Sequence, residues 1–224
     1  FPTRRSSDLL FALKRLLGVS PRTPNTMVYG ETARCPLYID STISTVRYWF
    51  KLLRMDADRL PRQAYDMSLR EVNDKNWPIT VKKTLDDYGF SFVWMNNGVT
   101  NENAFLKLLK QRMTDSFFQH WSSKLEGSER FTLYRSFKPY FNSEDYFTKL
   151  TISKFRIAFT RFRLGMNVLK TNQRYKTVDY TCSCGKSIEN EVHFLFVCSH
   201  YVDLRNKYLQ KHIQFKNCGN AVLL

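Results

Sequence analysis

Apolar side chains at helical spacing constrain the fold of this chain more than any other feature. Between residues 105 and 121 they recur every three or four positions, which lays them along one face of a long α-helix. The members of this stripe are Phe105, Leu108, Leu109, Met113, Phe117 and Trp121. A second stripe spans about 80° of a helical wheel and comprises Ile152, Phe155, Phe159, Phe162 and Met166. The pattern predicts a mainly α-helical fold that buries Trp49, Trp121, Phe155, Phe159 and Phe162.

Turn residues, and changes in the spacing of apolar residues, indicate where the other predicted elements begin and end. Residues 10–36 carry three prolines and Gly30, so we expect a brief helix or strand followed by an irregular linker. Helices are predicted from Asp40 or Ser41 toward Pro61, over 61–71, and from Trp77 to Gly89. Two short helices are predicted before Pro139 and after Ser143. Residues 90–99 alternate apolar and polar side chains and are predicted to form a strand.

These elements suggest a division of the chain. The first nine residues, FPTRRSSDL, resemble a translated sequencing adapter, so we exclude them and expect the remainder to be a fragment of a longer protein. After the irregular linker at 10–36, residues 37–177 are predicted to form a helical region. Residues 178–213 are predicted to form a small CCHC zinc-binding module, and 214–224 a tail.

Positive charge points to a polyanionic partner. The chain has 35 Lys and Arg against 20 Asp and Glu, a net charge of +15. Between residues 151 and 181 one acid faces seven basic residues, which are Lys154, Arg156, Arg161, Arg163, Lys170, Arg174 and Lys176. Such a segment fits sequence-independent contacts with the phosphates of RNA or DNA, and it equally fits a solvated helix face that keeps the protein soluble. No apolar run is long enough for a transmembrane helix, and we expect no membrane partner; an anionic membrane surface is the alternative polyanion.

Cysteine usage indicates the compartment. The chain has five cysteines, an odd number, and no secretory signal peptide. A disulfide framework is therefore not expected, and we expect an intracellular protein, in the nucleus or the cytoplasm, that is not secreted.

A cysteine and histidine set near the end of the chain has the composition of a metal site. Cys182, Cys184, His193 and Cys198 supply three thiolates and one imidazole, which suit tetrahedral zinc and leave no open coordination position. The predicted site is thus structural. Its first pair is CxC, one residue shorter than the CxxC of common zinc sites. The alternatives are His200 as a substitute ligand, or buried free cysteines beside a core histidine.

The sequence lacks the usual signatures of an enzyme. It has no glycine-rich phosphate loop, no nucleophile paired with a histidine, and no paired aspartates of a polymerase palm. The acidic pairs Asp86-Asp87 and Glu144-Asp145 lie on helical segments, where adjacent side chains point apart. We therefore expect this chain not to be catalytic.

Several segments resemble a known family. Residues 16–65 (LLGVSPRTPNTMVYGETARCPLYIDSTISTVRYWFKLLRMDADRLPRQAY) resemble the segment after the reverse transcriptase domain in invertebrate LINE and jockey-like non-LTR retrotransposons. Residues 189–205 (ENEVHFLFVCSHYVDLR) resemble the zinc-binding region that closes such polyproteins, and 89–94 and 110–125 resemble parts between them.

The resemblance implies a non-catalytic fragment of an RNA-directed DNA polymerase polyprotein. The family's cysteine pair falls on Cys182 and Cys184, its histidine on His193 and its last cysteine on Cys198. The implied function is to grip template RNA or target DNA through the basic helix and the zinc site. The alternative is a basic helical protein-interaction domain that binds neither metal nor nucleic acid. The sequence does not indicate an oligomeric state.

Overall fold

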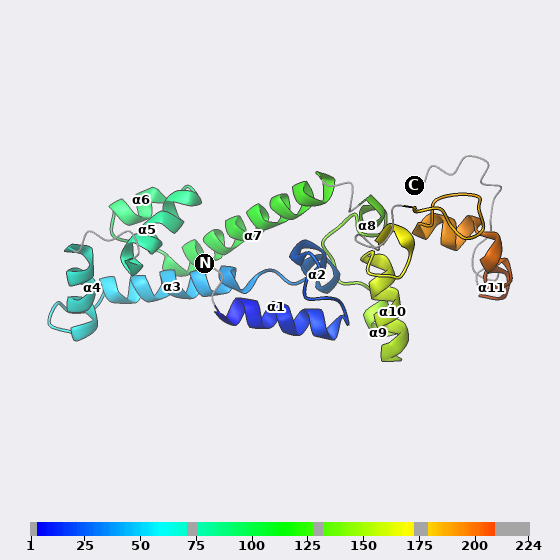
Figure 1. Cartoon of the computed structure of the whole chain (residues 1–224). Helices are drawn as coiled ribbons and strands as arrows, with labels where there is room; N and C mark the ends of the chain where they lie inside the picture. Colours follow the sequence, from blue (N-terminus) through cyan, green and yellow to red (C-terminus); the bar gives the residue numbers. More distant parts are fainter. Residues whose placement is uncertain (1–3, 71–75, 128–131, 173–178, 209–224) are drawn as a thin grey trace. The chain divides into compact units, whose positions relative to one another are not determined.

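The structure, a computed structural model, describes residues 4–70, 76–127, 132–172 and 179–208 (Figure 1). Within these ranges the chain is helical apart from its connecting loops and one isolated antiparallel bridge between Thr181 and Ile188. The predicted mainly α-helical fold is therefore confirmed. None of the described helices combines the length and the apolar composition needed to cross a bilayer.

Residue contacts divide the chain into two compact units. Unit 1 comprises Phe1–Leu9 and Arg34–Lys124, and unit 2 comprises Leu10–Ala33 and Leu125–Leu224. The helices of unit 1 are α3 (Leu37–Leu53), α4 (Leu60–Arg70), α5 (Trp77–Asp87), α6 (Ser91–Met95) and α7 (Glu102–Glu126), whose last two residues are assigned to unit 2.

Unit 1 is built around aromatic side chains. Trp49 on α3 is fully buried, stacks on Trp94 at 5.2 Å between ring centroids, and donates a 3.0 Å hydrogen bond to the Tyr65 hydroxyl. Leu109 and Met113 of α7 are buried in the same core. The helices predicted over 61–71, from Trp77 to Gly89 and over 105–121 are confirmed as α4, α5 and α7, as is the burial of Trp49 and Trp121.

The strand predicted over residues 90–99 is wrong, because this segment contains α6. Phe90 and Val93 are buried three positions apart, which is a helical spacing, whereas Phe92 and Met95 are exposed. Gly89 ends α5 with a φ of +80°, and the chain re-enters a helix two residues later. The described residues offer this segment no partner strand, so the short alternation cannot be satisfied by pairing.

Unit 2 contains helices from both ends of the chain. They are the part of α1 (Arg4–Leu16) from Leu10 onward, α2 (Asn25–Thr32), α8 (Thr132–Phe137), α9 (Tyr146–Lys149), α10 (Ser153–Arg163) and α11 (Val202–Tyr208). In residues 10–36 the expected brief helix is present as the end of α1, but the irregular linker expected after it is wrong for α2. Pro21 lies in the loop between α1 and α2, and Pro24 and Pro36 directly precede α2 and α3, so none of the three prolines interrupts a helix.

The buried side of α10 is not the predicted one. Ile152, Phe155 and Phe159 are 53%, 53% and 41% exposed, so the prediction that Phe155 and Phe159 are buried is wrong. Phe162 is half-buried. Thr160 and Arg163, which lie about 120° and 60° from the centre of the apolar stripe on the wheel, are buried. The aromatic stripe of this helix therefore remains largely on the surface of unit 2.

A buried polar network explains this orientation. Arg163 Nη2 lies 3.1 Å from Glu31 on α2 and 2.9 Å from Glu144, and Glu31 is fully buried. The Tyr146 hydroxyl donates to Glu31 at 2.7 Å and lies 2.8 Å from the Thr160 hydroxyl. A buried carboxylate needs a charged partner and hydrogen bonds, and Arg163 on α10 supplies the charged partner.

Candidate metal centre

The structure brings all four predicted ligand residues together. The ligand atoms of Cys182, Cys184, His193 and Cys198 lie within 4.8 Å of one another. Cys182 Sγ is 3.6 Å from Cys198 Sγ, and Cys184 Sγ is 3.2 Å from His193 Nε2. Tetrahedral zinc with ordinary bond lengths separates two sulfurs by about 3.8 Å and a sulfur from a nitrogen by about 3.5 Å. The cluster could hold a metal ion.

A tight turn presents the first two thiols. The amide of Gly185 donates to the Cys182 carbonyl at 2.8 Å, and Gly185 has a φ of +73°. On either side of the turn, the Cys182 amide donates to the Ser187 carbonyl and the Glu189 amide to the Tyr180 carbonyl, both at 2.8 Å. These bonds close a small loop, whose turn directs both sulfurs of the CxC pair toward the other two ligands.

A π-helical turn, His193–Val197, presents the other two ligands. The Cys198 amide donates to the His193 carbonyl at 2.7 Å, which is an i to i+5 bond. In an α-helix, residues five apart lie about 140° apart around the axis. The wider turn removes most of this offset and directs both side chains to one side. Asn190, three residues before the turn, accepts a hydrogen bond from the His193 amide through its side-chain oxygen at 2.8 Å.

Backbone amides contact two of the thiols. The Lys186 amide bonds to Cys184, and with smaller contributions from the hydrogen bonds of Cys182, His193 and Cys198 it lowers the pKa of the Cys184 thiol to about 6. Burial raises the pKa of Cys198, and the His200 amide partly opposes this effect. Each amide lies two residues after its cysteine, outside the gap between Cys182 and Cys184.

The remaining candidates lie outside the cluster. His200, the alternative ligand, is exposed, and its Nδ1 lies 3.3 Å from the Ser183 hydroxyl. Cys35 belongs to unit 1, and Cys218 lies outside the described residues. His193 directs Nε2 toward Cys184, whereas its Nδ1 is buried and has no hydrogen-bond partner within the described ranges. The set of four is therefore the one predicted from the sequence.

Side-chain contacts join residues 179–208, the cysteine-rich segment, to the end of α10 and the residues just after it. The Phe162 and Phe194 rings lie 6.1 Å apart, and Asn167 Nδ2 donates to Glu191 at 2.9 Å. Within the segment itself, Arg205 on α11 donates to the Cys198 carbonyl at 2.5 Å. The segment thus packs on residues that the sequence placed in the preceding helical region.

The predicted basic segment does not form a single free surface. Lys154 and Arg161 are exposed. Arg156 is half-buried and donates to the Leu150 carbonyl, and Lys170 donates to the Thr181 carbonyl. Arg163 is buried between two carboxylates, so its assignment to phosphate binding is corrected to a structural role. The other two predicted residues, Arg174 and Lys176, lie outside the described residues.

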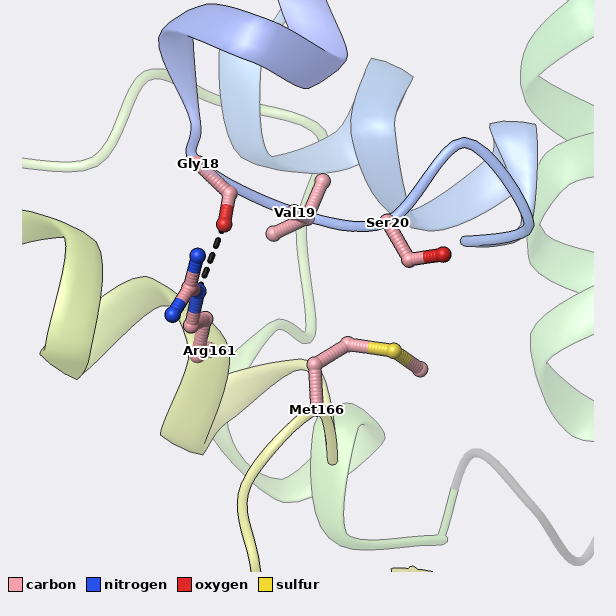
Figure 2. Close-up of a pocket in the computed structure, with 5 residues that line it drawn as sticks. All are labelled: Gly18, Val19, Ser20, Arg161 and Met166. Atoms are coloured by element: carbon pink, nitrogen blue, oxygen red, sulfur yellow. Dashed lines mark hydrogen bonds between the residues drawn. The ribbon is translucent and has the colours of Figure 1, made fainter.

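Arg161 lines a pocket that the sequence did not indicate. Figure 2 shows its guanidinium reaching toward the Gly18 carbonyl, to which Nε donates at 2.5 Å. The pocket has a volume of about 460 Å³, and its lining residues are Gly18, Val19, Ser20, Arg161 and Met166. A Cβ at Gly18 would lie 2.5 Å from Ile157 Cγ2, so a glycine permits this close approach to α10. Gly18 was the sequence feature that could have indicated this pocket, but Ile157 and Arg161, which lie against it, are distant in the sequence.

Comparisons with known proteins do not identify the chain. No protein-family model matches it, and no curated protein or solved structure matches it. The resemblance to retrotransposon polyproteins stays a prediction from the segments quoted above.

Proposed function

We propose that this chain is a non-catalytic, zinc-stabilised nucleic-acid-binding module, of the kind implied by the resemblance to the region after a retrotransposon reverse transcriptase. One observation carries the proposal, namely the convergence of the ligand atoms of Cys182, Cys184, His193 and Cys198 within 4.8 Å. Three thiolates and one imidazole match the preference of zinc, and four protein ligands complete its tetrahedral shell. Zinc bound there would stabilise the fold.

The composition of the cysteine-rich segment supports a structural role for the metal. Within residues 179–208 the buried apolar side chains are only those of the ligands Cys182 and Cys198, while Phe194 is half-buried. A segment of this size cannot hold a defined turn and a π-helical turn together through so little apolar burial. A metal that binds only the folded arrangement adds its binding free energy to folding.

Charge supports nucleic acid as the partner. The chain carries a net charge of +15, and α10 displays Lys154 and Arg161 without any acidic residue in its own sequence. Phosphate contacts release condensed counterions, so affinity should fall log-linearly as salt rises. Contacts of this kind do not read sequence, which agrees with the predicted partner class.

Salt-dependent binding tests this proposal. The full chain should bind unrelated RNA and DNA oligonucleotides in fluorescence anisotropy, with a steep negative slope of log affinity against log salt. Lys154→Glu with Arg161→Glu should flatten the slope by roughly one unit per lost contact. The matched control is Lys82→Glu with Lys107→Glu, which makes the same change of net charge at exposed positions of unit 1, away from α10. Binding that is absent, or insensitive to salt, would contradict the proposal and favour the protein-interaction alternative.

A further inference from the structure

One side of α10 carries aromatic and basic side chains that the fold leaves in solvent. Phe155 is 53% exposed, and the Lys154 ammonium lies 5.1 Å from the centroid of its ring. On a helical wheel, Ala158 lies about 40° from Lys154, Arg161 about 20° away on the other side, and Phe155 about 100° away. We call these four residues the α10 ridge. It combines an aromatic ring and two cations around a small residue.

The polar network of unit 2 holds the α10 ridge outward. Thr160 lies about 140° and Arg163 about 80° from Phe155 around the helix, and both are buried against Glu31 and Tyr146. Rotation of α10 to bury Phe155 would expose or unpair Arg163, which is costly for a buried ion pair. The exposure of Phe155 is therefore enforced by contacts elsewhere in the helix.

Arg161 is oriented before any ligand arrives. Its Nε donates to the Gly18 carbonyl at 2.5 Å, which fixes the plane of the guanidinium (Figure 2). Its terminal amino groups have no hydrogen-bond partner in the described part of the chain. A guanidinium held in this way can donate two parallel bonds to a phosphate. Lys154 lies seven residues earlier, about 10 Å along the helix axis.

From these features we propose that the α10 ridge is a stacking platform for single-stranded nucleic acid, an inference that rests on the proposed function and names the form of its ligand. Lys154 and Arg161 bind phosphates of the strand, and Phe155 stacks on an unpaired base. In a duplex the base faces are already covered by neighbouring bases, so Phe155 gains nothing from it. The absence of acidic residues from α10 suits a polyanion over an acidic or apolar surface.

A comparison of oligonucleotide forms tests the proposal on the full chain. The wild-type protein should bind a 20-nucleotide mixed-sequence single strand more tightly than the corresponding duplex in fluorescence anisotropy. Phe155→Ala should weaken single-strand binding about 5- to 150-fold, as loss of one base stack predicts, and should leave duplex binding unchanged. Phe155→Trp should retain the single-strand affinity. An abasic single strand should show no effect of either substitution.

Salt dependence separates the roles of ring and cation. Phe155→Ala should leave the salt slope unchanged, whereas Lys154→Gln should reduce it by about 0.7 on a single strand. Tyr140→Ala removes an aromatic ring that is 74% exposed outside α10, and it should have no effect. All three substitutions change exposed side chains, and circular dichroism will show that the variants fold.

The outcomes distinguish this inference from the proposed function. If the wild-type chain binds single strand and duplex alike, and Phe155→Ala behaves like Tyr140→Ala, the stacking platform is refuted while nucleic-acid binding stands. If the chain binds neither form, both proposals fall. If Phe155→Ala abolishes self-association, or binding to anionic vesicles, without changing oligonucleotide affinity, the ridge contacts a different partner and the inference is wrong.

Discussion

Replacement of Arg163 by Met should destabilise unit 2 strongly. The side chain is 9% exposed, and its guanidinium contacts Glu31, which is fully buried, and Glu144, which is 16% exposed. Met keeps most of the aliphatic volume, so the change removes mainly the charge. Loss of one partner leaves the other charge buried and uncompensated, which costs about 3 to 5 kcal/mol. The loss of free energy of unfolding should fall in this range.

Urea unfolding followed at two places measures the effect. All four tryptophans lie within Arg34–Lys124, so tryptophan fluorescence reports on unit 1, which the substitution should leave unchanged. Hydrogen exchange of peptides that cover α2 and α10 reports on unit 2, where protection should fall. Arg161→Met is the matched control, since this exposed arginine makes one bond to the Gly18 carbonyl and should cost about 1 kcal/mol or less.

Two results would refute this reasoning. One is an Arg163→Met effect within about 1 kcal/mol of that of Arg161→Met. The other is strict additivity of Arg163→Met with Glu31→Gln, because residues in one ion-pair network should show coupling of about 0.5 to 3 kcal/mol. Either result would place Arg163 among solvated cations, as the sequence alone suggested.

Three further predictions concern stability. Gly18→Ala should lower the free energy of unfolding of unit 2 in urea by at least about 1 kcal/mol. Its φ of +65° disfavours a side chain, and Ile157 occupies the added Cβ position. Ile157→Ala should relieve the clash with Ile157 but not the strain from the positive φ. Burial first, and then Glu31, raises the pKa of Tyr134 and Tyr146 above the usual 10, so stability that is complete below pH 10 should fall above it by up to about 1.4 kcal/mol per pH unit for each. Tyr146→Phe should make that decline shallower, and an unchanged slope would refute the assignment. Trp49→Ala should cost about 3 to 5 kcal/mol in unit 1, measured by circular dichroism in urea, and a cost below about 1 would contradict its burial.

Local patterns predicted most of the helices. The stripe over residues 105–121 correctly predicted a helix, because apolar residues three or four positions apart share one helix face. In α7 that face places Leu109 and Met113 in the core of unit 1. The pattern over 90–99 misled because a short alternation also fits a helix when its buried positions, Phe90 and Val93, are three apart. Such short runs need the tertiary context to be assigned.

The orientation of α10 depended on residues far away in sequence. Periodicity ranks apolar side chains as the buried ones, but Glu31 lies 132 residues from Arg163, and no local pattern shows that the two pair. Once the pair forms, it fixes which side of the helix is buried. The metal cluster was predictable for the opposite reason, since all its ligands lie within Cys182–Cys198 and few residue types bind zinc.

The metal content of the full chain shows whether Cys182, Cys184, His193 and Cys198 bind zinc. We expect about one equivalent of zinc per chain in freshly purified protein. Removal by a chelator should abolish hydrogen-exchange protection over residues 179–208, while unit 1 remains protected. Cys198→Ser should act like the chelator, whereas Cys35→Ser, which changes a cysteine outside the cluster, should not. A protein without metal, whose residues 179–208 are equally protected in chelator and in Cys198→Ser, would contradict the account.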